Sequence, residues 1–236
     1  MNESLTYRRS FLGQLVGAAA AAGVTLAAPR RAAAETTAGD EWIQEVKGEH
    51  RCLFDSPQHA NGMPLLHILN YLNTYATAYK TTPGQVGAVS TFYSAGPRAS
   101  IPLGFNDAMW AKYQLGAYLN LNDASGKPYV RNVYNKPTEG DLHLLMAAIQ
   151  SPAIPALAGA VPMIGIENLQ KMGTKFILCA NALGIWSLEL EARGKGKAQE
   201  IEKDLRANVL PGVTIVPAMV IAIDKAQEAG IKYNRQ

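Results

Sequence analysis

The chain has 236 residues, of which 48% are hydrophobic and 17% are charged. This composition excludes intrinsically disordered and collagen-like proteins, and the length suits one domain with a substantial core, or two small ones. Two cysteines are too few for a disulfide framework or a four-thiolate metal site. The formal charge of +3 is a weak indication of nucleic-acid binding.

The first 34 residues have the pattern of an export signal. Arg8 and Arg9 form a twin-arginine pattern, an Ala/Gly-rich apolar run follows over 11–28, and three alanines end at Ala34. This order predicts export of the folded protein by the twin-arginine machinery, with cleavage after Ala34. An uncleaved membrane anchor is the alternative, but so much Ala and Gly makes a poor membrane span. We therefore expect a periplasmic protein.

Removal of this segment changes the charge balance. Residues 1–34 contain four of the 22 basic and one of the 19 acidic residues, so 18 of each remain and the rest of the chain is formally neutral. The indication of nucleic-acid binding therefore disappears, and we expect no nucleic-acid partner. Charges of both signs are interleaved over 195–206, as is typical of a solvent-exposed helix face.

After a linker at 35–48, residues 49–236 are expected to form one domain in which strands alternate with helices. Short apolar runs predict strands at 51–55, 86–93, 176–179, 213–216 and 231–233. Apolar residues at helical spacing predict helices at 64–79, 106–115, from 141, 164–172, directly after 179, and 217–230. The segment 151–162 has no clear assignment, and the middle section near 104–150 is long. This alternation predicts a three-layer α/β/α sandwich with a mostly parallel sheet.

Ligands of parallel sheets bind at the carboxyl ends of the strands, so the candidate binding residues are those that follow strands. His59 and Asn61 follow the first strand, Arg98 follows the second, and Asn181 follows the third. Arg98 is suited to hold an anion, but the glycine patterns of nucleotide-binding loops are absent. We therefore expect no resident cofactor.

A metal or haem site remains an alternative. It would be formed by His59, His67 and Cys179. The sequence has no HxxxH, CxxC or CxxCH motif, which favours histidines without a metal. His67 also lies off the apolar stripe of its predicted helix, so we expect it at the surface.

Cys179 is the best-placed residue for chemistry. It ends an apolar strand and a helix can begin directly after it, so its thiol would lie at the positive end of the helix dipole, near free N–H groups. Both features stabilise a thiolate. A buried structural cysteine is the alternative. Cys52 lies early in the first strand, where we expect it in the core and too far from Cys179 for a disulfide.

Several segments together resemble the DsrE/DsrF-like family, which includes sulfur-relay and sulfur-oxidation proteins. They are Lys-Phe-Ile-Leu-Cys-Ala-Asn-Ala-Leu at 175–183, Leu-Pro-Gly-Val at 210–213, Val-Pro-Ala at 216–218 and Gln-Glu-Ala-Gly at 227–230. The segments 106–116 and 126–132 resemble an exported subgroup of that family. The resemblance implies a homo-oligomeric α/β sandwich in which a cysteine after a central strand, here Cys179, accepts sulfur as a persulfide. The long middle section departs from the small sulfur-relay members.

These observations lead to three hypotheses. The first is a periplasmic sulfur carrier or transferase that forms a persulfide on Cys179 and has a sulfur donor or acceptor protein as its partner. The second is a non-catalytic protein that binds a small ligand, metal or haem in a strand-end cleft formed by His59, Asn61, Arg98 and the turn that contains Asn181. The third is an oligomeric structural domain with an inert cysteine. Because one fold hosts many activities, the fold is the firmer expectation.

Overall fold

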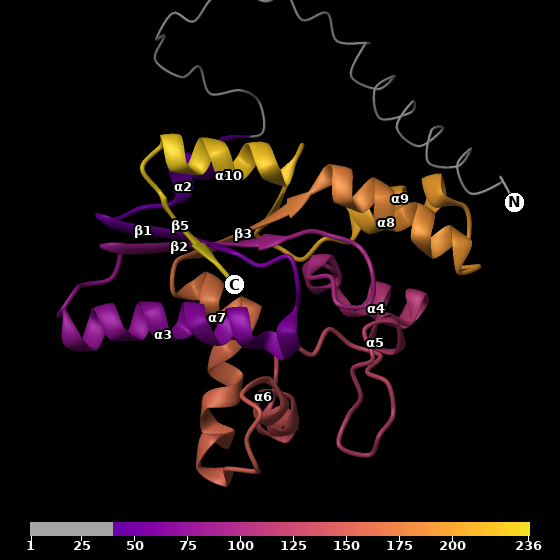
Figure 1. Cartoon of the computed structure of the whole chain (residues 1–236), viewed down its shortest axis with the longest axis horizontal. Coiled ribbons are helices and arrows are strands. Elements are labelled where there is room, and N and C mark those ends of the chain that lie inside the picture. The colour runs from indigo at the N-terminus through magenta and orange to yellow at the C-terminus, as the bar shows by residue number, and fades with distance from the viewer. Residues whose placement is uncertain (1–39) are drawn as a thin grey trace, which may run out of the picture. The chain divides into compact units, whose positions relative to one another are not determined.

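The structure is a computed structural model that describes residues 40–236 (Figure 1). The expected signal and its cleavage site lie outside the described residues. Five strands form one sheet in the order β4-β3-β2-β1-β5, and every neighbouring pair is parallel. The strands are β1 (His50–Asp55), β2 (Val86–Phe92), β3 (Thr174–Cys179), β4 (Val213–Val216) and β5 (Lys232–Arg235).

Helices cover both faces of the sheet, so the three-layer α/β/α sandwich expected from the sequence is confirmed. α3 (Met63–Ala78) and α7 (Ile166–Lys171) lie on one face, and α10 (Met219–Glu228) lies on the other (Figure 1). α8 (Ala180–Ala192) and α9 (Ala198–Ala207) follow β3 and pack against each other. Within residues 40–236, no helix is long and apolar enough to cross a membrane.

The fold begins before the expected boundary at residue 49. The short helix α2 (Trp42–Glu45) buries Trp42 and Ile43, and Val46 is buried directly after it. Burial of these side chains removes a large apolar area from water, so the segment contributes to the core rather than linking to it.

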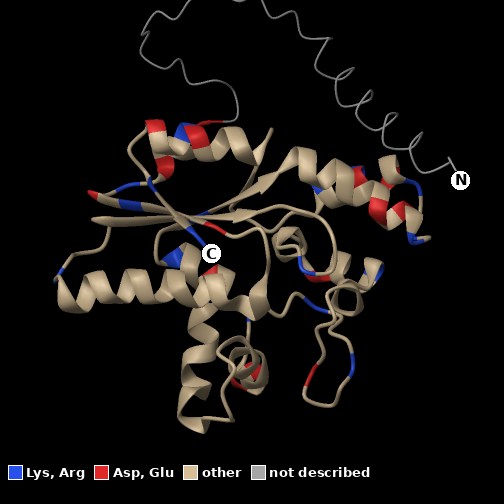
Figure 2. Ribbon diagram, in the orientation of Figure 1, with Lys and Arg blue, Asp and Glu red and all other residues tan. Residues whose placement is uncertain are grey.

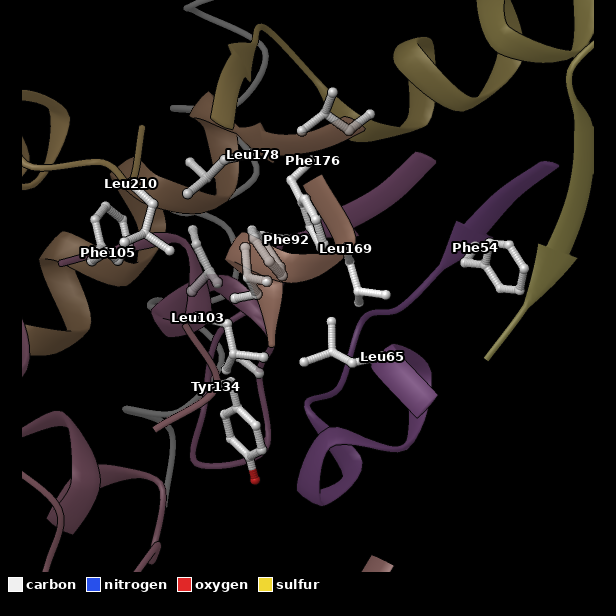
Figure 3. Packing of buried hydrophobic residues seen from close by; sticks show 14 of the residues in the cluster. Phe54, Leu65, Phe92, Leu103, Phe105, Tyr134, Leu169, Phe176, Leu178 and Leu210 are labelled. Atoms are coloured by element: carbon white, nitrogen blue, oxygen red, sulfur yellow. The ribbon is translucent and has the colours of Figure 1, made fainter. Parts of the chain in front are cut away.

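The core lies on both sides of the sheet because the second half of β3 is apolar and buried. Phe176, Ile177 and Leu178 of β3 are fully buried, and the ring of Phe176 stacks on Phe92 of β2 with centroids 5.2 Å apart (Figure 3). Such uninterrupted apolar runs are typical of strands that are covered on both faces.

The apolar stripe of α3 is shorter than the sequence indicates. Its first three turns bury five side chains, Pro64, Leu65, Ile68, Leu69 and Leu72. Ala76 and Tyr79 continue the helical spacing but are exposed, with Tyr79 at 70%. The end of the helix therefore extends past the sheet, and its tyrosines line a groove between α3 and the C-terminal end of β5.

The long middle section consists of short helices and irregular chain. It contains α4 (Asp107–Tyr113), α5 (Leu115–Tyr118) and α6 (Leu142–Ala148). A 3-10 helix, Pro155–Ile164, follows it and covers most of the segment without a predicted structure. The helix expected at 106–115 ends at Tyr113 because Gln114 adopts a left-handed conformation with φ 55°. The polar segment between α5 and α6 has neither a strand nor a long helix, as its composition predicts.

The charges over 195–206 form the solvated helix face expected from the sequence. α9 carries both signs on its surface (Figure 2). Arg206 pairs with Glu202 one turn earlier at 2.7 Å, and Asp204 pairs with Lys112 of α4 at 2.8 Å. Exposed pairs of this kind contribute little to stability, so this helix is held mainly by buried Ile201 and Leu205.

Candidate functional site

Cys179 lies at the junction between β3 and α8, where it is the N-cap residue of the helix. Its Sγ accepts a hydrogen bond from the backbone N–H of Ala182, at 3.3 Å, which belongs to the first turn of α8. It accepts a second, also at 3.3 Å, from the backbone N–H of Met219, the first residue of α10. The N-termini of two helices therefore converge on one sulfur atom.

The sheet register produces this convergence. β3 and β4 are paired so that Cys179 lies opposite Val216, and the two strands end level with each other. The backbone N–H of Asn181 donates to the carbonyl of Pro217 at 3.3 Å, which ties the turn after β3 to the turn after β4. Because β4 leads into α10 within three residues, Met219 comes within reach of the sulfur.

This geometry favours negative charge on the sulfur. Each helix N-terminus has the positive end of a helix dipole and backbone N–H groups without a partner inside the helix. α8 has 13 residues and α10 has 10, so both are long enough to have a significant dipole. Cys179 is only 5% exposed, so burial opposes a charge on the sulfur, whereas weak screening by water strengthens its two contacts with N–H groups.

The surface beside the Cys179 turn holds a groove whose lining is partly apolar, with Ile185 and Leu188, and partly charged, with Glu202 and Arg206. α8 and α9 enclose a groove of about 430 Å³ whose wall begins at Ala180 and Asn181. Asn181 itself is exposed. Four exposed aliphatic side chains lie on the two helices that start at this site, Ile185 and Leu188 on α8 and Val220 and Ile221 on α10.

His59 is engaged in the structure of its own loop. The residue is buried, its Nδ1 accepts the backbone N–H of Asn61 at 3.2 Å, and its own backbone N–H donates to the carbonyl of Arg98 at 2.9 Å. Burial lowers the pKa of His59, and a hydrogen bond with the backbone of Pro97 partly opposes this effect. The imidazole therefore stabilises the junction of two loops rather than facing an open cleft.

The other predicted binding residues divide into two places. Asn61 has a left-handed backbone with φ 50° and lines a small hollow of only about 10 Å³. Arg98 is exposed on the neighbouring loop. Asn181 instead belongs to the Cys179 turn and its groove. A backbone hydrogen bond therefore connects His59 to Arg98. Asn181 lies in the same turn as Cys179, and Asn61 and Asn181 line different hollows.

The suggested metal ligands do not form a cluster. His67 is exposed on α3, as expected, and its Nδ1 contacts the side-chain oxygen of Gln236. Among residues 40–236, no group of three or more His, Cys, Asp or Glu side chains is arranged to hold a metal ion. Both cysteines are free and buried, so Cys52 and Cys179 are not linked to each other.

The sequence interpretation missed a polar cluster at the end of β1. Asp55 is buried, and its carboxylate accepts hydrogen bonds from the hydroxyls of Tyr233 at 2.7 Å, Tyr93 at 2.8 Å and Thr91 at 3.4 Å. Burial, reinforced by the hydrogen bond to Asp55, raises the pKa of Tyr93. Arg235 completes the cluster with an ion pair at 3.4 Å. An acidic residue directly after the apolar run 52–54 was the available signal.

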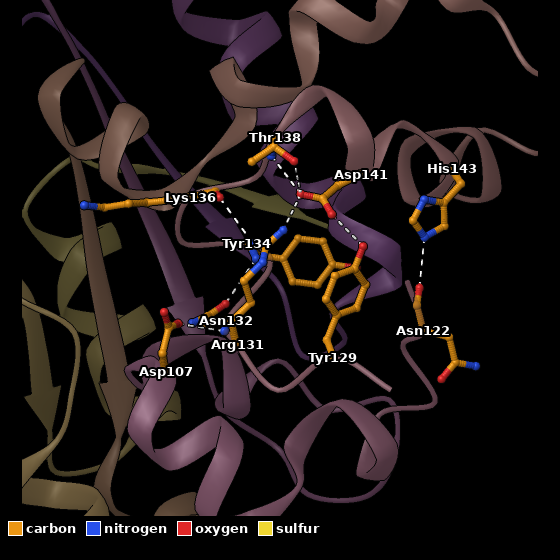
Figure 4. A network of polar contacts seen from close by, with 10 residues as sticks. All are labelled: Asp107, Asn122, Tyr129, Arg131, Asn132, Tyr134, Lys136, Thr138, Asp141 and His143. Carbon is orange, nitrogen blue, oxygen red and sulfur yellow. Dashed lines mark hydrogen bonds and ion pairs between the residues drawn. The ribbon is translucent and has the colours of Figure 1, made fainter. Parts of the chain in front are cut away.

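A second polar network stabilises the long middle section (Figure 4). Asp141 accepts hydrogen bonds from Tyr129 at 2.5 Å, from Arg131 at 2.6 Å and from the backbone N–H of Thr138 at 2.7 Å. Burial opposes ionisation of Asp141, but these three donors outweigh it and lower the pKa of the carboxyl group. The network fixes the irregular chain before α6 and has no free nucleophile, so we regard it as structural.

Neither the models of known families nor the curated proteins nor the solved structures give a match to this chain.

Proposed function

We propose that this protein is a periplasmic sulfur carrier or transferase of the DsrE-like type, with Cys179 as the thiol that is loaded with sulfur. The observation that carries the proposal is the pair of backbone N–H groups, from Ala182 and Met219, that both donate to the Cys179 sulfur. A cysteine thiolate is the reactive form, and helix N-termini are among the environments that promote it. The resemblance of the segment 175–183 to sulfur-relay proteins supports the same chemistry.

The transfer requires no external oxidant or reductant. The Cys179 thiolate attacks the outer sulfur of a persulfide donor, R–S–SH, and its electron pair forms the new S–S bond. The S–S bond of the donor breaks, and its electron pair leaves with the donor thiolate, R–S⁻. The product is Cys179–S–SH, and the same exchange with an acceptor thiolate returns Cys179 to the starting state.

The two N–H groups have a defined role in this cycle. They hold the attacking thiolate before transfer, and they stabilise it again when it leaves after transfer to the acceptor. The exposed aliphatic side chains of α8 and α10, the two helices that begin at the turn, would contact the protein that delivers or receives the sulfur. Export by the twin-arginine route would place this exchange in the periplasm.

The second cysteine provides a matched control. Cys52 is also buried in the sheet, but its Sγ lies 3.9 Å from the Leu53 carbonyl, where it acts as a weak donor rather than an acceptor. Burial raises the pKa of the Cys52 thiol, and the nearby Lys232 ammonium only partly offsets this. Cys52 is therefore expected to remain a thiol under conditions in which Cys179 reacts.

Intact-protein mass spectrometry after treatment with a persulfide donor tests the proposal. We expect an increase of about 32 Da, one sulfur atom, that maps to Cys179 and is reversed by a reducing agent. The Cys52→Ser variant should load like the wild type, and the Cys179→Ser variant should not load. An unchanged mass of the wild type, or equal loading of the two variants, would contradict a sulfur-carrying role for Cys179.

The location is tested separately. N-terminal sequencing of the protein recovered from the periplasm should begin at Glu35, directly after the expected cleavage site. A chain that retains Met1 would contradict cleavage without bearing on the chemistry of Cys179.

A further inference from the structure

The Cys179 sulfur accepts hydrogen bonds at the start of two helices, although it belongs to only one of them. Cys179 is the N-cap residue of α8, and a side chain at that position ordinarily accepts an N–H of the first helical turn. The contact with Ala182 has this form. The contact with Met219 does not, because Met219 begins α10, which follows β4 in the chain. One sulfur atom therefore caps its own helix and a second helix from another part of the chain.

The N-cap position of α10 supplies no acceptor side chain. It is occupied by Ala218, whose methyl group cannot accept a hydrogen bond, and the first turn that follows has the sequence Met-Val-Ile-Ala at 219–222. The backbone of Ala218 is extended, with φ −145° and ψ 130°, as in an ordinary N-cap residue, so the position lacks only the acceptor atom. Met219 is 2% exposed, so water is a poor substitute for the sulfur. The first turn of α10 is thus stabilised by Cys179 of β3.

Sulfur loading changes the acceptor that caps α10. In the unloaded protein, a thiolate has its negative charge on Sγ, which both N–H groups contact. In the persulfide, the charge lies on the outer sulfur, about 2 Å further along the new S–S bond. Sγ is then a neutral sulfur, which is a weak acceptor. Because hydrogen bonds to a charged acceptor are roughly twice as strong as neutral ones, both contacts weaken on loading.

We infer that loading of Cys179 with sulfur loosens the first turn of α10 and thereby changes the surface that this turn presents. The inference rests on the proposed function, since it concerns the persulfide of the same thiol. Val220 and Ile221 follow Met219 directly and are 72% and 53% exposed. A protein that docks on these two side chains meets a different surface in the loaded and in the unloaded state. A sulfur acceptor can therefore distinguish the two states before any exchange takes place.

The change is confined to the start of α10. The backbone N–H of Asn181 donates to the carbonyl of Pro217 at 3.3 Å, and this bond does not involve the sulfur. It keeps the turn after β3 attached to the turn after β4 in both states. The weakened contact of Ala182 lies within α8, next to the cysteine, whereas the contact of Met219 joins two separate elements. The effect on exposed side chains is therefore expected at α10.

Hydrogen exchange of the Ala222 amide, followed by NMR, tests the inference. This N–H makes the first bond inside α10, to the Ala218 carbonyl at 3.0 Å, so it exchanges when the first turn opens. Its exchange should be about threefold or more faster in the loaded than in the unloaded protein. The Ala229 N–H, which donates to the Lys225 carbonyl at the other end of α10, is the internal control and should not change. Cys179→Ala removes the acceptor without any sulfur chemistry and should accelerate Ala222 about fivefold or more.

Two further variants make the test specific. Ala218→Ser gives α10 a cap of its own, because a serine hydroxyl at the N-cap position accepts an N–H of the first turn. In this variant, loading of Cys179 should change the exchange of Ala222 by less than about 1.5-fold, and in the Cys179→Ala background it should restore slow exchange. Cys52→Ser is the matched cysteine control and should respond to loading like the wild type.

The inference is wrong if Ala222 exchanges equally fast in the wild type and in Cys179→Ala, or equally fast in the loaded and the unloaded protein. It is also wrong if the Ala218→Ser variant keeps the full response to loading. A protein that no persulfide donor can load contradicts the proposed function instead. A methylthio group, placed on Cys179 with methyl methanethiosulfonate in the Cys52→Ser variant, then replaces the persulfide in the same comparison, so the two failures remain distinguishable.

Discussion

The ends of β1 and β3 hold two buried polar side chains in very different ways. At the end of β1, the Asp55 carboxylate is bound by side chains, the hydroxyls of Tyr93 and Tyr233 and the guanidinium of Arg235. At the end of β3, the Cys179 sulfur is bound only by backbone N–H groups, from Ala182 and Met219. Both residues lie at the carboxyl edge of the same parallel sheet.

The difference separates a structural site from a site that is suited to chemistry. The partners of Asp55 come from two other strands, so the carboxylate joins the edge strand β5 to the centre of the sheet. The donors to Cys179 belong to the helices themselves and are present whatever side chains those helices carry. These backbone donors stabilise a thiolate at Cys179, and they do so without a side chain that would block access of a reactant to the sulfur. The two strand ends should therefore respond differently to substitution.

The largest expected effect is on stability at the β1 end. Asp55→Ala leaves the Tyr93, Tyr233 and Thr91 hydroxyls without their acceptor and opens a small cavity, which should lower the free energy of unfolding by about 4 kcal/mol. For a domain of this size, the midpoint of thermal unfolding would fall by about 10 °C. Tyr233→Phe is the milder control and removes one hydrogen bond only.

Thermal unfolding by circular dichroism measures both variants. If Asp55→Ala proves as stable as the wild type, the cluster does not fasten β5. The interpretation of the β1 end as a structural site then fails.

The next effect concerns the reactivity of the two cysteines, since β1 also carries Cys52. In single-cysteine variants, Cys179 in Cys52→Ser should react with iodoacetamide at neutral pH at least about ten times faster than Cys52 in Cys179→Ser. The reason is that two backbone N–H groups donate hydrogen bonds to the Cys179 sulfur and stabilise a thiolate there. Burial instead raises the pKa of the Cys52 thiol.

The rates are measured on the native proteins by mass spectrometry. The rates of the unfolded proteins, in which both thiols are fully accessible, are the reference. Equal native rates would mean that the two helix N-termini do not activate Cys179. Faster modification of Cys52 would reverse the comparison.

The features that could be predicted from the sequence are those with a local signal. Short, largely apolar segments at 86–93 and 176–179 predict buried strands, and helical spacing begins directly after Cys179. The parallel sheet and the position of Cys179 at a strand end follow from these signals. The helix break at Gln114 does not, because a left-handed conformation of a residue other than glycine is imposed by its surroundings.

The missed site features depend on distant partners. Met219 lies 40 residues after Cys179 and acts through its backbone, which leaves no trace in side-chain composition. Tyr233 lies 178 residues after Asp55, and only the strand order, with β5 beside β1, brings the two together. The position of His59 directly after a strand predicts that it lines a strand-end cleft, but the loop satisfies its own polar groups and buries the imidazole.

A smaller effect separates the capping role of Cys179 from its chemical role. Serine is a good N-cap residue and its hydroxyl can accept the Ala182 N–H, so Cys179→Ser should change the free energy of unfolding by less than about 0.5 kcal/mol. Cys179→Ala loses the cap and should cost about 1 kcal/mol. Chemical denaturation measures both, and a Ser variant less stable than the Ala variant would contradict the capping geometry.

The smallest effect returns to the β1 end and depends on pH. Burial lowers the pKa of His59 below its ordinary value of 6.5, so the unfolded chain takes up a proton at a higher pH than the folded chain does. Stability is therefore unaffected above that value and falls as the pH decreases from about 6.5 towards the lowered pKa of the folded state.

His59→Asn isolates this contribution, because an asparagine oxygen can replace Nδ1 as the acceptor for the Asn61 N–H but does not titrate. Unfolding free energies measured between pH 7.5 and pH 5 should fall less steeply in this variant than in the wild type. If His59→Asn keeps the wild-type slope, His59 protonates equally readily in both states, and the β1 end is more open to water than its buried carboxylate implies.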